Sequence, residues 1–354
     1  MNKNNTIIFL LLLLATTFTA SEALAGNKDR VGQAGASELL INPWGRSSGL
    51  HGMNTSFVKG LESMRINPGG LAFTKKTEIL FSSSRWLEGS GISVNAFGFA
   101  QKIGEESVIG FNAVSMSFGE LDVTTVESPD GGTGSTFRPQ LLNLGLSYAR
   151  SFSNSIHVGF VFRLINESIA NVSASGVGID MGIQYVTGPT ENIHFGIALR
   201  NIGTPLKFRG DGLTTQLSAP SGTFNSTIDR RSEKFELPSL LNIGGAYDFR
   251  FGEKHRLTLL ANFTSNSFTK DFLGGGFEYA LNEMFMLRAG YRYEEGITSA
   301  LSLSERSTAY TGLSGGISVE VPLKEDGPAL GIDYAYRTSN PYNGTHTIGV
   351  RINL

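Results

Sequence analysis

The sequence predicts an all-β fold: a 14-stranded antiparallel transmembrane β-barrel, preceded by a separate N-terminal segment. Three observations lead to this prediction. Apolar residues alternate with polar residues or glycine along many segments, these segments are about ten residues long, and the connections between them are alternately short and long. A tilted strand of about ten residues crosses the hydrocarbon core of a membrane, whereas strands of soluble proteins usually have about five or six residues.

The composition excludes several classes of protein. The chain has 354 residues and no cysteine, which excludes a disulfide scaffold, a cysteine-ligated metal and a cysteine nucleophile. Its 29 Lys and Arg residues balance 31 Asp and Glu residues, so no basic excess supports nucleic-acid binding. Charged residues make up 17% of the chain, against about 25% in soluble domains, and its 44 glycines exceed the usual share of about 7%. The low charge suggests a surface that does not face water.

The amino terminus has the pattern of a secretory signal peptide. Lys3 precedes an apolar run over 7–14, and Ala23-Leu24-Ala25 supplies the small residues that a signal peptidase recognises. The apolar run is too short to span a bilayer core, which needs roughly 20 apolar residues. We therefore expect residues 1–25 to be removed and the mature chain to begin at Gly26.

The alternation is clearest at the carboxyl end. Ile348, Val350 and Ile352 share one face, which we expect to contact lipid, and Gly349 and Arg351 lie on the other. The same pattern predicts strands at 77–84, 92–101, 107–118, 140–150, 155–165, 176–187, 191–200, 238–250, 255–264, 271–281, 284–293, 310–321, 328–337 and 344–354. Together they give a barrel over 77–354.

The connections indicate which way the barrel faces. Those after even-numbered strands are short turns, whereas most after odd-numbered strands are long polar loops, at 119–139, 166–175, 201–237 and 294–309. Outer-membrane barrels place short turns in the periplasm and long loops outside the cell. A large secreted β-sandwich would also alternate, but its exposed face should carry more Lys, Glu and Thr than the polar faces found here.

Residues 26–76 do not alternate and form a separate unit, the hatch segment. They contain two Asn-Pro dipeptides, which favour turns, and the run Asn67, Pro68, Gly69, Gly70 and Leu71 directly before the first strand. An ordinary turn leading into that strand is the alternative interpretation of this run.

The hatch segment resembles a known family. The runs that carry the resemblance are Gly35-Ala36-Ser37-Glu38-Leu39-Leu40, Gly45-Arg46-Ser47-Ser48-Gly49-Leu50-His51-Gly52 and Arg65-Ile66-Asn67-Pro68-Gly69-Gly70-Leu71-Ala72. They are similar to the N-terminal signature of the PorV/PorQ group, within the wider fatty-acid-transporter (FadL-like) superfamily of outer-membrane barrels. The resemblance implies a hatch that plugs a fourteen-stranded barrel. In this chain Gly69 stands where the superfamily motif usually has alanine, and the chain ends in Leu354 where many such barrels end in an aromatic residue.

The sequence offers few candidates for catalytic or metal-binding residues. The five histidines lack metal-ligand spacing and no Ser/His/Asp constellation can be assembled from spacing alone, so we expect no metal, no cofactor and no enzyme activity. Charged residues instead occupy the polar face of the strands. The candidates for the luminal wall are Arg163, Asp180, Arg200, Asp248, Arg288, Arg292, Asp333, Arg337 and Arg351, with Arg250 as a further candidate. They could line a conduction path, hold a carboxylate, or bind the backbone of the hatch.

Two functions remain. The PorV/PorQ resemblance implies an accessory role in type IX protein secretion, with a translocon or exported cargo proteins as partners of the long loops. The alternative is FadL-like transport of long-chain fatty acids or other hydrophobic small molecules. Both place the chain in the outer membrane of a Gram-negative cell, in contact with membrane lipid.

Overall fold

The computed structural model describes residues 30–132, 134–218, 222, 225–299, 308–324 and 327–354. The signal peptide expected at 1–25 lies outside these residues. In the described parts of the chain, no helix has both the length and the hydrophobicity needed to cross a membrane.

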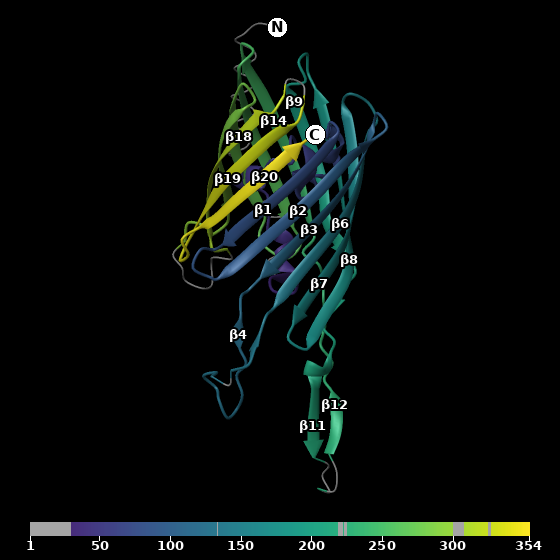
Figure 1. Ribbon diagram of the computed structural model, residues 1–354, viewed down its shortest axis with the longest axis vertical. Coiled ribbons are helices and arrows are strands. Elements are labelled where there is room, and N and C mark those ends of the chain that lie inside the picture. The colour runs from purple at the N-terminus through teal and green to yellow at the C-terminus, as the bar shows by residue number, and fades with distance from the viewer. Residues whose placement is uncertain (1–29, 133, 219–221, 223–224, 300–307, 325–326) are drawn as a thin grey trace.

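Fourteen antiparallel strands form a closed barrel, as predicted (Figure 1). In order around the barrel they are β1 (Thr77–Trp86), β2 (Ile92–Ile103), β3 (Ser107–Ser117), β6 (Gln140–Ser151), β7 (Ile156–Ile169), β8 (Val172–Thr187), β9 (Ile193–Gly203), β14 (Leu240–Phe251), β15 (His255–Asn266), β16 (Phe272–Leu281), β17 (Phe285–Glu294), β18 (Tyr310–Pro322), β19 (Ala329–Ser339) and β20 (Thr345–Asn353). Each strand pairs with its neighbour in the chain, and β1 pairs with β20 to close the ring.

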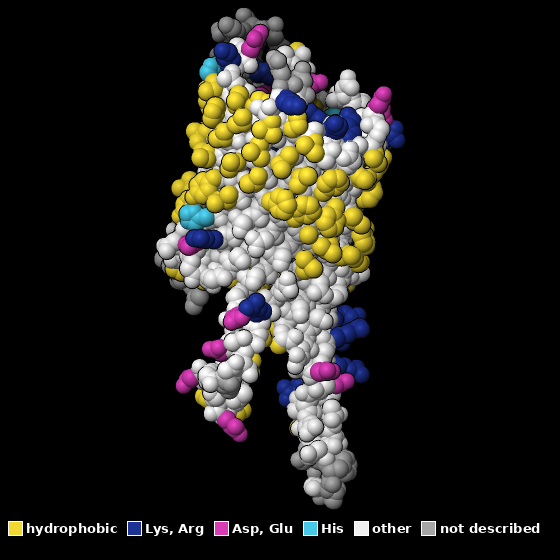
Figure 2. All heavy atoms as spheres, viewed as in Figure 1, with side chains coloured by type: hydrophobic (Ala, Val, Ile, Leu, Met, Phe, Trp, Pro, Cys, Tyr) yellow, Lys and Arg dark blue, Asp and Glu magenta, His cyan; other side chains and the backbone are white. Residues whose placement is uncertain are grey.

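The two faces of each strand differ as the alternation predicts. On β20, Ile348 and Val350 are exposed on the outside, while Thr347 and Arg351 are buried inside. Apolar side chains of this kind cover the outer wall in a broad band, with charged groups gathered beyond its two ends (Figure 2). Such a band is the lipid-facing surface of a transmembrane barrel.

The prediction of a long loop at 166–175 is wrong. β7 continues to Ile169 and β8 begins at Val172, so that only two residues connect them. Ala170 adopts a left-handed conformation with φ of 48°, which suits a tight hairpin. The strands extend because Asn166 and Ser175 are cross-strand partners, and the Asn166 side chain donates to the Ser175 hydroxyl at 2.8 Å. These polar residues alternate with inward-facing neighbours, and their polarity was mistaken for that of a loop.

Two of the predicted long loops contain β-structure of their own. The first carries β4 (Leu121–Asp122) and β5 (Thr136–Phe137). The second carries the pair β10 (Leu206–Lys207) and β13 (Lys234–Phe235), the short helix η5 (Asp211–Leu213), and a hairpin of β11 (Thr214–Ser218) and β12 (Asn225–Asp229). Both project well beyond the apolar band at one end of the barrel (Figure 1). We call this the long-loop end and the opposite one the short-turn end.

The hatch segment lies inside the barrel (Figure 1, purple). It forms the short helices η2 (Ser37–Leu40), α2 (Gly45–Gly49), η3 (Gly60–Glu62), α3 (Ser63–Ile66) and η4 (Pro68–Phe73). Helix η4 contacts β3, β6, β7 and β8, whereas α2 contacts β17 to β20. Side chains of the hatch, including Trp44, Leu61 and Leu71, pack with inward-facing residues of the wall in one buried apolar cluster. This burial stabilises the hatch against the wall.

The lipid-facing register predicts a depth-dependent cost of charge. Ile317 lies at the middle of β18 and Val321 lies on the same outer face near the short-turn end. Ile317→Arg should destabilise the barrel by about 2–4 kcal/mol, and the matched control Val321→Arg by about 0–1 kcal/mol, since the penalty falls towards the membrane surface. Reversible urea unfolding in lipid vesicles measures both. Equal costs would contradict the assigned placement of β18 in the membrane.

Candidate functional site

The run Asn67–Leu71 forms the start of η4, and its first residue hydrogen-bonds this helix to the wall. The Asn67 side-chain oxygen accepts from the Gly69 backbone amide at 3.1 Å. Its amide nitrogen donates to the carbonyl oxygens of Thr55 and Ile183, both at 2.9 Å. Thr55 belongs to the hatch and Ile183 to β8, so one side chain ties the hatch to itself and to the barrel.

Two glycines of the wall allow this close approach. A Cβ atom at Gly182 would lie 2.0 Å from the Asn67 side-chain oxygen, and one at Gly159 would lie 2.3 Å from the Pro68 carbonyl oxygen. Neither position has room for a side chain unless the hatch moves. Leu71, at the end of the run, is fully buried in the apolar cluster between hatch and wall.

Three of the wall arginines donate hydrogen bonds to hatch carbonyl groups. Arg163 donates to Met64 at 3.2 Å, Arg200 to Leu39 at 3.4 Å and Arg337 to Asn42 at 3.4 Å. Arg163 also forms a fully buried ion pair with Asp180, whose other oxygen accepts from the Asn201 amide at 2.7 Å. Arg163 and Arg200 therefore bind carbonyl groups of the short helices α3 and η2, and Arg337 binds one in the link between η2 and α2.

The remaining wall candidates lie in other surroundings. Arg351 pairs with Asp333 at 3.2 Å and with Glu320 at 2.7 Å. Arg288 pairs with Glu278 at 2.6 Å, and Asp248 contacts His194 at 3.1 Å. The Arg292 guanidinium lies over the Phe272 ring, 4.3 Å from its centroid, whereas Arg250 is exposed near the short-turn end. The structure thus divides the predicted set into hatch contacts, wall ion pairs and groups that face open space.

A cavity of about 390 Å³ lies between the hatch and the wall at the long-loop end. We call it the long-loop cavity. Much of its lining is apolar or aromatic, and includes Ile41, Trp86, Met116, Phe118, Leu141 and Phe272. A pocket of this size and character suits a small hydrophobic molecule.

The same cavity carries three cations, the buried Glu294 carboxylate and a neutral histidine. Arg200, Arg292 and Arg337 line it, and the Nε atom of each is buried without a hydrogen-bond partner among the described residues. His51 of the hatch also lines the cavity. Both of its ring nitrogens are buried without a hydrogen-bond partner among the described residues, and its ring packs edge-on against Tyr310. Burial, together with Arg292 and Arg337, lowers the pKa of His51 well below its ordinary value. Its ring is therefore neutral and can both donate and accept a hydrogen bond.

The sequence reasoning missed the lining of this cavity. The sequence assigns His51 no role beyond its lack of metal-ligand spacing with the other histidines, and it does not single out the aromatic residues. A usable signal was present, because Trp86, Met116 and Phe118 fall on the polar, inward face of their strands, at the ends next to the longer connections. Large apolar residues on a face that is otherwise polar indicate a local apolar lining of the lumen.

The histidines outside this cavity have other partners. His157 lies 2.8 Å from the Ser151 hydroxyl, His255 lies 2.7 Å from the Tyr279 hydroxyl, and His346 lies 2.8 Å from the Tyr334 hydroxyl. Over the residues that the structure describes, no three His, Asp or Glu side chains lie together as a metal site would require.

Comparison with known proteins identifies solved structures that have the same fold. No protein-family model and no curated protein matches the sequence. Among solved structures, the Pseudomonas putida toluene transporter TodX matches with a TM-score of 0.56 at 12% identity, over 88% of this chain and 97% of that one. The Ralstonia pickettii toluene transporter TbuX matches with a TM-score of 0.53 at 14% identity, over 88% and 97% of the two chains. A Pseudomonas aeruginosa FadL homologue gives 0.50 at 12% identity, over 86% and 96%.

These similarities extend over nearly the whole length of the solved proteins. They show that the chain has the fold of FadL-like outer-membrane barrels, which is the architecture expected from the sequence. At such low identity the likeness concerns the fold alone.

The tight contact at Gly182 predicts how the hatch can be loosened. Gly182→Leu should push Asn67 and the start of η4 away from β8, at about 1–3 kcal/mol, because the site has no room for added atoms. The barrel should still close, since its strand ladder does not involve the hatch. Ion conductance in planar bilayers should therefore increase. The control is Gly245→Leu, a strand glycine on the outer face, which should leave the conductance unchanged.

The buried pair of Arg163 and Asp180 predicts an asymmetric response to substitution. Arg163→Met leaves the Asp180 carboxylate buried without its cation, and should destabilise the protein by about 3–5 kcal/mol. Arg163→Met combined with Asp180→Leu should recover part of that loss, because the carboxylate is removed together with its ion-pair partner, while Arg200 loses the attraction of Asp180. Urea unfolding of the single and double variants measures the difference. A double variant no more stable than the single one would show that the pair does not act as a unit.

Proposed function

We propose that this protein is an outer-membrane transporter of small hydrophobic molecules that carry an anionic group. The observation behind the proposal is the long-loop cavity, where aromatic and aliphatic walls surround three guanidinium groups with unpartnered Nε atoms. An apolar wall favours the hydrophobic part of a ligand in proportion to the area it buries. The cations favour an anionic group, because a buried charge is stable only when it is paired and hydrogen-bonded.

The position of the cavity agrees with a transport role. It lies between the hatch and the long-loop end, at the mouth of a barrel whose lumen the hatch occupies. A ligand held there rests on the hatch through His51 and on the wall through Arg292. Movement of the hatch is then the step that carries the ligand further, and the close contacts at Gly159 and Gly182 are the ones it must break.

The solved structures with the same fold support transport as the general class. They include two toluene transporters and a FadL homologue. Toluene is uncharged, whereas the cavity here contains three arginines, Arg200, Arg292 and Arg337, against one carboxylate, Glu294. The charge of the cavity therefore favours an anionic ligand for this chain over a neutral hydrocarbon.

The secretion role implied by the PorV/PorQ resemblance rests on the hatch motifs alone. No comparison with known proteins supports it, and the cavity is not needed for a role confined to the outer loops. Transport is the function that the arrangement of side chains favours.

Equilibrium binding to the full-length protein in lipid nanodiscs tests the proposal. Radiolabelled decanoate should bind saturably, and more tightly than decanol, which has the same chain length without the charge. Arg292→Gln should weaken decanoate binding by about tenfold and leave decanol binding nearly unchanged, since it removes one charge-assisted contact. The control Arg85→Gln removes an exposed cation at the same end of the barrel, outside the cavity, and should bind both ligands normally.

Two outcomes would count against transport. One is the absence of saturable binding of either ligand. The other is unchanged ligand binding together with lost protein secretion when the segment 204–237 is shortened in cells, which would favour the secretion role.

A further inference from the structure

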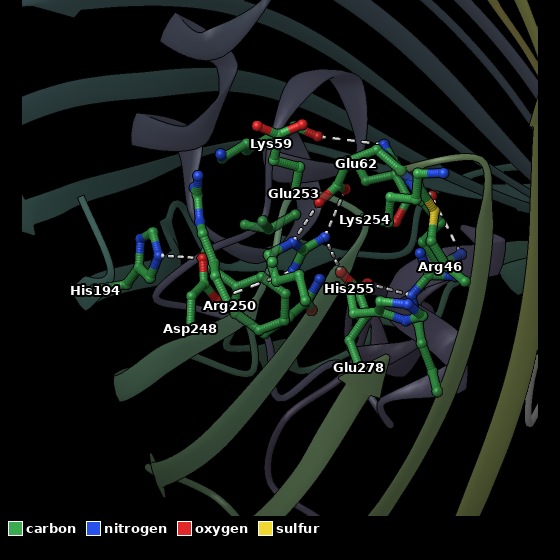
Figure 3. A pocket seen from close by; sticks show the side chains of 18 residues that line it. Arg46, Lys59, Glu62, His194, Asp248, Arg250, Glu253, Lys254, His255 and Glu278 are labelled. Atoms are coloured by element: carbon green, nitrogen blue, oxygen red, sulfur yellow. Dashed lines mark hydrogen bonds and ion pairs between the residues drawn. The ribbon is translucent and has the colours of Figure 1, made fainter. Parts of the chain in front are cut away.

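A second cavity, of about 440 Å³, lies at the other end of the hatch. We call it the short-turn cavity, because residues 252–255 of the β14–β15 turn and Glu283 of the β16–β17 turn line it. Hatch residues, among them Lys59 and Glu62, form the opposite side. Charged side chains from the hatch, the wall and the turn converge on this space (Figure 3).

Most carboxylates around the short-turn cavity are already neutralised. Arg46 pairs with Glu62 at 3.3 Å, and the Ser47 backbone amide donates to the same carboxylate at 2.9 Å. Glu278 pairs with both Arg256, at 2.9 Å, and Arg288, at 2.6 Å.

Two further carboxylates are engaged in the same way. Arg256 also reaches Glu283 at 2.7 Å. Asp248 lies 3.1 Å from His194 and accepts from the Thr258 hydroxyl. Each of these carboxylates is thus held by a fixed partner, which leaves few negative charges free.

Three cations in the same cavity have no such partner. Lys59 comes from the hatch, Arg250 from β14 and Lys254 from the turn that follows. Within the described residues, no carboxylate lies within ion-pair distance of any of them, and Glu253 is the lining carboxylate that remains unpaired. The unpaired groups are therefore three cations and one carboxylate, in a lining that contains six Lys and Arg side chains and five Asp and Glu side chains in all.

Lys59 is the cation most affected by this setting. Its ammonium group lies 5.2 Å from the centroid of the Phe73 ring. Confinement by the surrounding protein, followed by the positive charge of Arg256, lowers its pKa, although Asp248, Glu283 and Glu278 offset part of this effect. A cation in such a position gains from an approaching anion, because the anion offsets both the lost hydration and the like-charge repulsion.

We propose that the short-turn cavity is an anion-binding site for a small molecule bearing a carboxylate or phosphate group. Lys59, Arg250 and Lys254 approach from three separate chain segments and can contact one anion together. A recess lined by low-dielectric walls concentrates the field of such charges and raises the local concentration of anions. The proposal stands without the transport function, since it depends on a cavity that shares no lining residue with the first.

Isothermal titration calorimetry on the full-length protein in detergent, at low ionic strength, tests this site. Inorganic phosphate and citrate are the probes, and the tighter of the two identifies the preferred kind of anion. We expect saturable binding that weakens as sodium chloride is added. The double variant Lys59→Gln/Arg250→Gln should bind at least about tenfold more weakly, because it loses two charge-assisted contacts.

Two matched controls separate this site from other cationic positions. Arg85→Gln removes an exposed cation at the long-loop end, and Arg150→Gln removes an exposed cation at the short-turn end that does not line the cavity; both should bind the probes as the unmodified protein does. Heat-dependent gel mobility verifies that every variant is a folded barrel. The proposal is overturned if neither probe binds saturably, or if the Lys59→Gln/Arg250→Gln protein is folded and binds like the unmodified one. Decanoate binding by that double variant reports on the transport proposal independently.

Discussion

Lipid offers no hydrogen-bond partner to a peptide group, and the rest of the structure depends on this constraint. A sheet in lipid must leave no edge, so the first strand has to pair with the last. The ladder between Glu78–Arg85 of β1 and His346–Asn353 of β20 meets that requirement. Closure also separates the side chains, because alternate residues must face either lipid or the interior. The apolar band outside and the charged wall inside are two results of the same closure.

The interior then has to satisfy its own polar groups. Short helices of three to six residues leave many carbonyl groups without intrahelical partners. Some wall arginines donate hydrogen bonds to hatch carbonyl groups, and other wall arginines form buried ion pairs with carboxylates. Further cations line the two cavities, one at each end of the hatch. The two cavities differ accordingly: one joins cations to an aromatic wall, and the other joins them to neutralised carboxylates and solvent.

The sequence was sufficient for the strands and their register, because a period of two residues decides which side chains meet lipid. It was not sufficient where polarity has two explanations. Asn166 and Ser175 are polar because they pair across strands, but the same residues would suit a loop. The long-loop cavity combines His51, Trp86 and Arg292, which are far apart in the chain, so no local pattern joins them. The fastening of Asn67 to Ile183 could not be derived either, since it depends on where the hatch rests inside the closed barrel.

The hatch precedes every strand in the chain and touches opposite sides of the ring, through η4 on β6 to β8 and through α2 on β17 to β20. Opposite arcs of the wall are therefore joined through one segment of the interior. The hatch is thus an internal cross-link between opposite arcs of a wall whose strand ladder closes without it.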